Sequence, residues 1–325
     1  TPSVAETTVI IDVVKVITPA VLAFVIGIII TPLLTHYLYK YQAWKKTPGK
    51  TALDGKEAAI FNLLHKEGEG KVPRMGGVVI WASATITIVG IWLLSKIVPT
   101  DLTVKLDFLS RDQTWIPLFA LLSGALVGLG NDILDVVGKG KGIPLFARLS
   151  IVSIVALFIG WWFFAKLDFS ALSIPFFGLL ELGWLIIPFF VLVALALYAG
   201  GVIDGIDGLS GGVFASIFAA YAVIAFNQEQ INLAAFSAML LGAILAFLWF
   251  NIPPARFWMT ETGTMGLTLS LAVVAFMTDT PGEGHGVSVL PIIAFLLVLT
   301  VASNIIQVLS KRFRHGKKVF LVAPL

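Results

Sequence analysis

Long apolar stretches constrain this chain more than any other feature, because nine of them follow one another along the sequence. Each is roughly 18 or more residues long, and a helix of about 20 residues crosses the ~30 Å hydrocarbon core of a bilayer. Pro291 marks a candidate kink in the ninth stretch. The stretches cover approximately residues 16–38, 76–97, 114–131, 148–165, 183–203, 209–226, 232–250, 262–278 and 287–310.

These stretches predict an all-α, polytopic helical membrane protein with nine transmembrane helices, forming one integral membrane domain over residues 1–325. The composition excludes a soluble domain, since 58% of the 325 residues are hydrophobic and only 13% are charged. No charged n-region, short apolar core and cleavage site begin at Thr1, so we expect the first helix itself to direct insertion. The chain has no cysteine, so redox arguments do not apply.

The distribution of basic residues predicts the orientation of the helices. If the N-terminus lies outside, the inside segments 39–75, 132–148, 251–261 and 311–325 hold 8, 3, 1 and 5 of the lysines and arginines. These segments therefore contain 17 of the 22 basic residues, which is a clear positive-inside pattern. We expect the long loop of residues 39–75 and the C-terminal segment to lie in the cytoplasm.

Four polar motifs interrupt the apolar pattern, and the helix count places all of them on the cytoplasmic side. The outside connections carry no comparable constellation. The four motifs are Pro73-Arg74-Met75-Gly76-Gly77, Asn131-Asp132-Ile133-Leu134-Asp135, Asp204-Gly205-Ile206-Asp207-Gly208 and Met259-Thr260-Glu261-Thr262-Gly263.

Five carboxylates of these motifs, Asp132, Asp135, Asp204, Asp207 and Glu261, are predicted to lie at three neighbouring helix ends. Each aspartate pair is spaced by three residues, so in a helical end its members share one face and repel each other. A bound cation would relieve this repulsion. Oxygen ligands without cysteine or a nearby histidine favour Mg²⁺ or Mn²⁺ over zinc, and Mg²⁺ commonly completes its shell with water and substrate phosphates. The pattern thus indicates a nucleotide or pyrophosphate substrate.

Other residues on the same side could contact such a substrate, but each also has a plainer interpretation. Lys139 and Lys141 stand among glycines and could meet phosphate charge, or form a solvated turn. Trp258 could stack on a base, or anchor the chain at the membrane interface. Residues 54–65 are compatible with a short interfacial helix or with a solvated linker. Acids at helix ends can simply mark the water boundary.

Taken in order, the four motifs, with Phe257-Trp258 extending the last, resemble those of the polyprenyl-phosphate N-acetylhexosamine-1-phosphate transferases. The resemblance covers about residues 20 to 325. Within that superfamily, the segment from Lys317 to Leu325 is similar to the sequence that precedes a histidine cluster in the bacterial phospho-N-acetylmuramoyl-pentapeptide transferases.

The chain departs from the family pattern at several positions. The family usually has two adjacent aspartates where Asn131 and Asp132 stand, and an aspartate at the position of Glu261. Tyr198 and Gly201 occupy positions where the family tends to carry asparagines. The resemblance would place a cluster of histidines and a tenth helix next, and the sequence contains neither up to Leu325. Glutamate can still bind Mg²⁺ through its longer arm, whereas asparagine loses the charge.

The resemblance implies a Mg²⁺-dependent enzyme of the bacterial inner membrane that acts in peptidoglycan biosynthesis, with its active site facing the cytoplasm. It would transfer phospho-N-acetylmuramoyl-pentapeptide from uridine diphosphate to undecaprenyl phosphate, releasing UMP. The implied catalytic residues are Asp132, Asp204 and Glu261, of which Asp204 and Glu261 would also hold the metal. The implied substrate contacts are Asp207 and Trp258 for the nucleoside, with Lys139, Lys141, Arg74, Asn131 and Asp135.

Three alternatives stay open. A sister transferase would use UDP-N-acetylglucosamine, and a catalytically impaired relative would bind lipid or nucleotide without turnover. An ion-coupled transporter belongs to a different class, and acids at one rim rather than at mid-bilayer argue against it. We expect the lipid bilayer as a partner, a homodimer as a candidate assembly, and no nucleic acid.

Overall fold

The computed structural model describes residues 4–44, 72–110, 113–138, 142–279, 284–314 and 319–320. Within these ranges nine helices are long and apolar enough to cross a membrane, and they correspond one for one to the nine predicted stretches. The all-α polytopic prediction is therefore confirmed. Lys139, Lys141, the predicted helix at 54–65 and most of the C-terminal motif lie outside the described residues.

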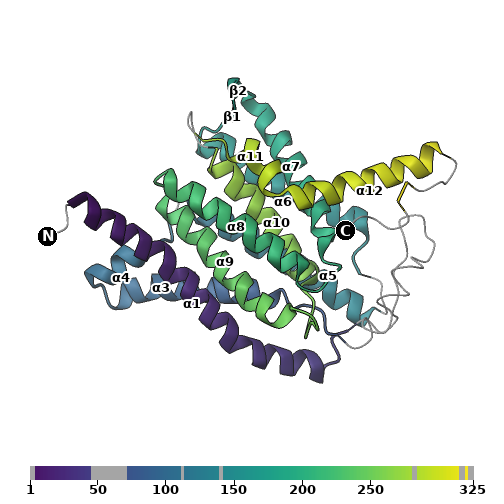
Figure 1. Cartoon of the computed structure of the whole chain (residues 1–325), viewed down its shortest axis with the longest axis horizontal. Coiled ribbons are helices and arrows are strands. Elements are labelled where there is room, and N and C mark those ends of the chain that lie inside the picture. The colour runs from purple at the N-terminus through teal and green to yellow at the C-terminus, as the bar shows by residue number, and fades with distance from the viewer. Residues whose placement is uncertain are drawn as a thin grey trace.

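The elements follow one another as a chain of helices with a single small hairpin (Figure 1). They are α1 (Val4–Lys40), α3 (Val78–Ile97), α4 (Asp101–Leu106), α5 (Trp115–Val137), α6 (Leu145–Lys166), β1 (Ala171–Ile174), β2 (Gly178–Glu181), η1 (Gly183–Leu185), α7 (Ile186–Gly200), η2 (Gly201–Ile203), α8 (Leu209–Asn227), α9 (Ile231–Asn251), α10 (Thr260–Met277), α11 (Gly286–Ile293) and α12 (Phe295–Phe313).

Helix α10 forms the centre of the bundle, and nearly all of its residues are buried. It packs most extensively against α5 and also contacts α7, while α1 packs on α9 and α8 packs on α9. An aromatic cluster of Phe163, Phe169, Phe190 and Phe276 joins α6 and α7 to the far end of α10, with ring centroids 4.8 to 5.9 Å apart. Such offset aromatic contacts add to the packing of a helical core.

Glycines allow α10 to approach its neighbours at backbone distance. A Cβ atom added to Gly128 of α5 would lie 2.0 Å from the carbonyl oxygen of Glu261, and one added to Gly77 would lie 2.2 Å from the amide nitrogen of Gly263. Small residues at such crossings are typical of helix packing in membranes. The beginning of α10 is thereby held against both α5 and the segment that precedes α3.

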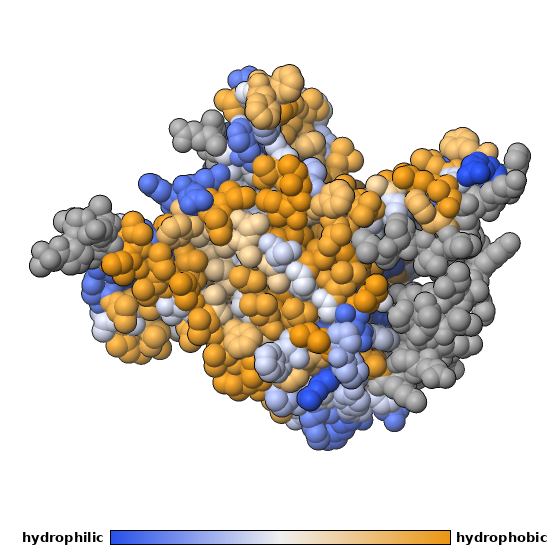
Figure 2. All heavy atoms as spheres, in the orientation of Figure 1, coloured by the Kyte–Doolittle hydropathy of each residue, from blue (hydrophilic) through white to orange (hydrophobic). Residues whose placement is uncertain are grey.

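The outer helices present apolar side chains that no other part of the described chain covers. Helices α1, α6 and α12 are the least buried of the nine candidate spans. Figure 2 shows hydrophobic residues over the middle of the visible face and hydrophilic residues toward its ends. This distribution suits a bundle surrounded by lipid, where the driving force for burying every apolar side chain is absent.

Three details differ from the sequence prediction. The ninth stretch is not one kinked helix, because α11, which contains Pro291, ends before Ala294 and α12 begins after it. The connection between α6 and α7, for which the sequence predicted no secondary structure, forms the β1–β2 hairpin. The connection between α3 and α5 contains the short helix α4, which Thr100 caps through a reciprocal hydrogen-bond pair with Thr103.

Candidate active site

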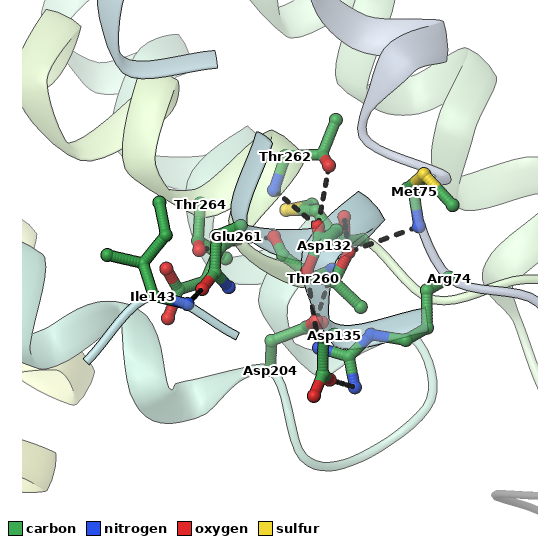
Figure 3. A network of polar contacts seen from close by, with 12 residues as sticks. Arg74, Met75, Asp132, Asp135, Ile143, Asp204, Thr260, Glu261, Thr262 and Thr264 are labelled. Carbon is green, nitrogen blue, oxygen red and sulfur yellow. Dashed lines mark hydrogen bonds and ion pairs between the residues drawn. The ribbon is translucent and has the colours of Figure 1, made fainter. Parts of the chain in front are cut away.

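Three segments that are distant in the sequence meet at the N-terminus of α10 (Figure 3). They are the end of α5, the turn between η2 and α8, and the segment before α3. All four polar motifs contribute to this region, so the prediction that they lie on one side of the bundle is confirmed by their contacts.

Asp132 on α5 is fully buried and has hydrogen-bond partners on both carboxylate oxygens. Its Oδ2 accepts hydrogen bonds from the hydroxyls of Thr260 and Thr262, at 2.5 and 2.6 Å, and from the amide of Thr262 at 2.9 Å. Its Oδ1 accepts from Nη2 of Arg74 at 3.2 Å. A carboxylate placed at the first turn of a helix satisfies amide groups that have no partner within the helix. Asp132 therefore fixes the position of the α10 N-terminus.

Thr260 links the two main carboxylates of the site. Its amide donates to Oδ2 of Asp204 at 2.7 Å, and its hydroxyl contacts Asp132 and accepts from the amide of Met75 at 3.1 Å. The backbone φ of Thr260 is +53°, a left-handed conformation that β-branched residues rarely adopt. The surrounding contacts must stabilise this strained residue, and strain of this kind concentrates at functional sites.

Asp204 lies in the turn between η2 and α8. Its Oδ1 accepts a 2.6 Å hydrogen bond from the hydroxyl of Ser210, in addition to the bond from Thr260. Gly208, with φ +79°, closes the turn before α8 begins at Leu209. The predicted shared face of Asp204 and Asp207 is wrong, because these residues occupy a turn rather than a helical end and contact different segments.

Glu261 follows Thr260 and forms an ion pair with Nη1 of Arg148 on α6. The hydroxyl of Tyr198, near the end of α7, lies 3.4 Å from its other carboxylate oxygen. The side chains of Glu261 and Arg148 are each about one-fifth exposed, so this pair lies at the accessible border of the site. Arg148 was not predicted as a site residue, since the sequence shows it only as one of several basic loop residues.

Arg74 bridges the two aspartates of the second motif. Its Nη1 lies 3.1 Å from Asp135 and its Nη2 lies 3.2 Å from Asp132. The predicted common face of this aspartate pair is confirmed. Arg74 and Arg148 therefore balance part of the negative charge that we expected a bound cation to neutralise. The five carboxylates still exceed the two guanidinium groups by three negative charges.

Asp207 and Trp258 are brought together as predicted, but they also bond to each other. The Trp258 indole N–H donates to Oδ1 of Asp207 at 3.0 Å, and the amide of Ala255 donates to Oδ2 at 3.1 Å. Asn251 holds the same loop by accepting from the Gly208 amide and donating to the Phe257 carbonyl. Asp207 thus has a structural role in the loop that carries Trp258. The indole bond leaves the aromatic ring available for stacking.

The region borders a surface hollow of about 410 Å³ that does not include the acidic residues. It lies at the end of α9 and along the loop before α10. Its lining residues are Trp249, Phe250, Ile252, Pro253, Pro254 and Arg256.

Asn131 is buried and its side chain is directed to a neighbouring loop. Its Oδ1 accepts a 2.8 Å hydrogen bond from the Ile143 amide, just before α6 begins. A Cβ atom added to Gly142 would lie 2.6 Å from the same oxygen. Asn131 therefore connects α5 to the segment that leads to Arg148. An aspartate at position 131, as in the family pattern, would place a second carboxylate next to Asp132 in this crowded space.

The carboxylates suit a hard divalent ion, although no three His, Cys, Asp or Glu side chains among the described residues form a ready metal cluster. Mg²⁺ needs only one or two protein carboxylates when phosphates and water complete its shell. Glu261 and Asp204 meet this requirement chemically. Oε1 of Glu261 is paired with Arg148, so a cation that bound this oxygen would have to displace Arg148.

Both arginines retain capacity for an anionic ligand. The Nε atoms of Arg74 and Arg148 are buried without a hydrogen-bond acceptor in the part of the chain that the structure describes. Each guanidinium group pairs with carboxylates through its Nη atoms and keeps its Nε–H free among the described residues. Because arginine binds phosphate oxygens through several N–H groups at once, these side chains are suited to bind a phosphate.

Comparison with known proteins identifies relatives that match most of the chain. The profile of glycosyl transferase family 4 matches residues 114–279. The chain is 32% identical to a phospho-N-acetylmuramoyl-pentapeptide-transferase of Anoxybacillus flavithermus over 94% of this chain and 86% of that protein. Identity to proteins of the same name is 34% in Geobacillus thermodenitrificans, over 75% of this chain and 74% of the relative. It is 29% in Clostridium perfringens, over 96% and 88%.

Proposed function

The chain belongs to glycosyl transferase family 4, as a polyprenyl-phosphate N-acetylhexosamine-1-phosphate transferase, and we propose that it transfers phospho-N-acetylmuramoyl-pentapeptide to undecaprenyl phosphate. The donor would be the uridine diphosphate derivative of the sugar, and UMP would be released. The product would be a lipid-linked precursor of peptidoglycan. The enzyme would act at the cytoplasmic face of the bacterial inner membrane.

The observation that best supports this proposal is the shared anchoring of α10 by Asp132 and Asp204. Together they fix Thr260, so that Glu261 projects toward Arg148 at the border of the site. This arrangement sets carboxylates and guanidinium groups at one end of a bundle whose sides are apolar. A soluble nucleotide could approach from the aqueous end while a polyprenyl chain remained in the lipid.

The proposed reaction is a displacement at phosphorus. An oxygen of the lipid phosphate forms a bond to the phosphorus next to the sugar, and the bond between that phosphorus and the UMP oxygen breaks. The main barrier is the approach of two anions, so positioning and electrostatic stabilisation provide most of the catalysis. Arg74 and Arg148 are the described cations closest to the acids that would surround this pyrophosphate.

Mg²⁺ is proposed as the cofactor, with Asp204 and Glu261 as its protein ligands. When bound, it would neutralise charge on the phosphate oxygens. Arg148, which is paired with Glu261, would supply a positive charge beside the same site. Asp204 and Glu261 would hold the ion, while Thr260 keeps the two side chains at a fixed separation through its backbone.

A single displacement fits the surroundings of Asp132 better than a phospho-enzyme intermediate. Asp132 is fully buried, and its carboxylate oxygens are engaged by Thr260, Thr262 and Arg74. The lipid phosphate has a second pKa of about 6 and is largely a dianion at neutral pH, so it needs little help from a base. We assign Asp132 a positioning role, and trapping of a phosphorylated Asp132 would contradict that assignment.

Two related functions remain as competing proposals because of specific residues. A sister transferase acting on UDP-N-acetylglucosamine would use the same carboxylates, since in the proposed reaction they would act on the pyrophosphate rather than on the sugar. A catalytically impaired relative is motivated by Asn131 and by the Glu261–Arg148 ion pair. Either function would retain the fold and the ion pairs of Arg74 and Arg148.

The test measures UMP release by the purified protein in lipid nanodiscs with undecaprenyl phosphate and Mg²⁺. The proposal predicts release with UDP-N-acetylmuramoyl-pentapeptide and its loss after chelation by EDTA. Release only with UDP-N-acetylglucosamine would identify the sister activity. Binding of either nucleotide without UMP release would identify the impaired relative.

A further inference from the structure

We propose that the β1–β2 hairpin is a membrane anchor that inserts its tip into the lipid interface at the bundle end opposite the candidate active site. The hairpin connects α6, which begins near Asn131, to α7, which ends near Asp204. Both helices span the bundle, so the hairpin must lie at the far end from these residues. Figure 1 shows it at the edge of the molecule, beside the ends of α6 and α7.

The base of the hairpin is attached firmly to the bundle. The amides of Leu182 and Gly183 both donate to the Ser170 carbonyl at 2.9 Å, which closes the base. Phe169 packs on Phe163 and Phe276 in the aromatic cluster. Leu172 and Ser173 of β1 are buried, and Ser288 of α11 donates to the Ser173 carbonyl. The hairpin therefore has a fixed direction relative to the helices.

The tip, in contrast, is apolar and uncovered by the described chain. The side chains of Phe176 and Phe177 are 104% and 88% exposed, and all four residues of β2 are exposed. Residues 174–180 read Ile-Pro-Phe-Phe-Gly-Leu-Leu and contain no charge. An isolated two-stranded hairpin is only marginally stable in water. This one would expose the apolar side chains of its tip and of both faces of β2, and exposed apolar patches of this kind mark interaction or membrane sites.

The surface next to the hairpin indicates that lipid, rather than protein, covers the tip. Trp184 lies in η1, between β2 and α7, and is 65% exposed; an exposed tryptophan beside the start of a membrane-spanning helix is typical of an interfacial aromatic belt. Leu185 of η1 and Leu192 of α7 extend the apolar surface on one side, and Trp161 extends it along α6. The hairpin is thus continuous with the lipid-facing sides of two membrane-spanning helices. Its charged residues, Asp168 and Glu181, lie at the base.

The absence of cysteine from the chain allows a direct test by spin labelling. A nitroxide is attached to Phe177→Cys, and a matched control label is attached to Asp101→Cys. Asp101 is exposed at the start of α4, at the same end of the bundle as the hairpin. Both proteins are reconstituted in lipid bilayers without substrates. Power-saturation EPR then measures collisions of each label with oxygen, which partitions into lipid, and with a water-soluble nickel chelate.

The proposal predicts that the label at position 177 collides more with oxygen than with the nickel chelate, while the label at position 101 shows the reverse. Equal nickel accessibility at the two positions would place the tip in water and overturn the proposal. Low accessibility to both reagents at position 177 would also overturn it, because a second copy or another protein would then cover the tip. Unchanged thermal unfolding of each labelled protein verifies that the fold is retained.

Discussion

The ion pair between Arg74 and Asp132 is the residue-level interaction that most directly couples folding to the site. Asp132 is fully buried, so a loss of Arg74 leaves a buried charge with fewer partners. We expect Arg74→Met to lower the free energy of unfolding by about 3 kcal/mol. The control is Lys105→Met, which removes an exposed pair with Asp101 and should cost less than about 1 kcal/mol.

Denaturant unfolding of both variants in detergent micelles measures this difference. Equal destabilisation by the two substitutions would show that Arg74 does not compensate the buried charge of Asp132.

Asp279, at the opposite end of the bundle, should produce a pH-dependent stability. It is 1% exposed, and neither carboxylate oxygen has a well-formed hydrogen bond among the described residues. Burial raises the pKa of Asp279 from 3.8 to about 6, although backbone N–H groups of Ser173, Val287 and Gly286 and the ring of His285 partly offset the rise. Tyr221, which also faces it, is buried and donates to the Gly286 carbonyl.

Because the folded state holds this proton more tightly than the unfolded state, its stability falls as the pH rises from about 4 to above 6. The cost at neutral pH is up to about 3 kcal/mol. We expect Asp279→Asn to remove this part of the pH dependence. Melting temperatures of both proteins from pH 4 to 8 provide the measurement, and parallel curves would refute the assignment.

At this scale the sequence predicted acidic residues well and their partners poorly. Asp132, Asp204 and Glu261 stood in recognisable motifs, and all three lie at the N-terminus of α10. Thr260 and Arg148 were missed as site residues because their roles depend on contacts between distant segments. The φ of +53° at Thr260 has no local signal in the sequence.

At the scale of elements, the contact between α5 and α10 decides where the site residues lie. A Cβ atom at position 128 would overlap the Glu261 carbonyl, whereas one at position 130 would meet no atom within 4 Å. Gly128→Ala should therefore separate the helices and reduce both stability and transfer. Gly130→Ala should leave transfer intact, and it could raise stability by about 0.5–1 kcal/mol because alanine favours the helix.

Melting temperature and UMP release, measured in parallel for these two variants, test the contact. Retention of wild-type activity by Gly128→Ala would mean that the site tolerates a shift of α10.

The lengths of the apolar stretches were sufficient to predict all nine candidate membrane-spanning helices, because the thickness of the bilayer sets the minimum length of such a helix. It was not sufficient for the β1–β2 hairpin or for the break at Ala294. Strands of four residues carry little periodicity. The break lies three residues after Pro291, beside a short helix, α11, that packs against α8, β1 and α10, and such contacts between distant segments are not visible in the sequence.

At the scale of the whole molecule, the positive-inside pattern makes a prediction about orientation. The site end of the bundle should face the cytoplasm and the hairpin end should face outward. In intact cells, a membrane-impermeant maleimide should label Asp101→Cys at once. It should label Arg312→Cys, at the exposed end of α12, only after permeabilisation. The opposite labelling order would invert the proposed topology.

The central claim is that the carboxylates at the N-terminus of α10 form the phosphoglycosyl transfer site. The most direct measurement is UMP release from UDP-N-acetylmuramoyl-pentapeptide by Asp204→Asn, compared with Asp279→Asn as a second aspartate at the other end of the bundle. We predict a loss of at least about 100-fold for Asp204→Asn with the fold retained, and activity close to wild type for Asp279→Asn. Normal turnover by folded Asp204→Asn would contradict this account.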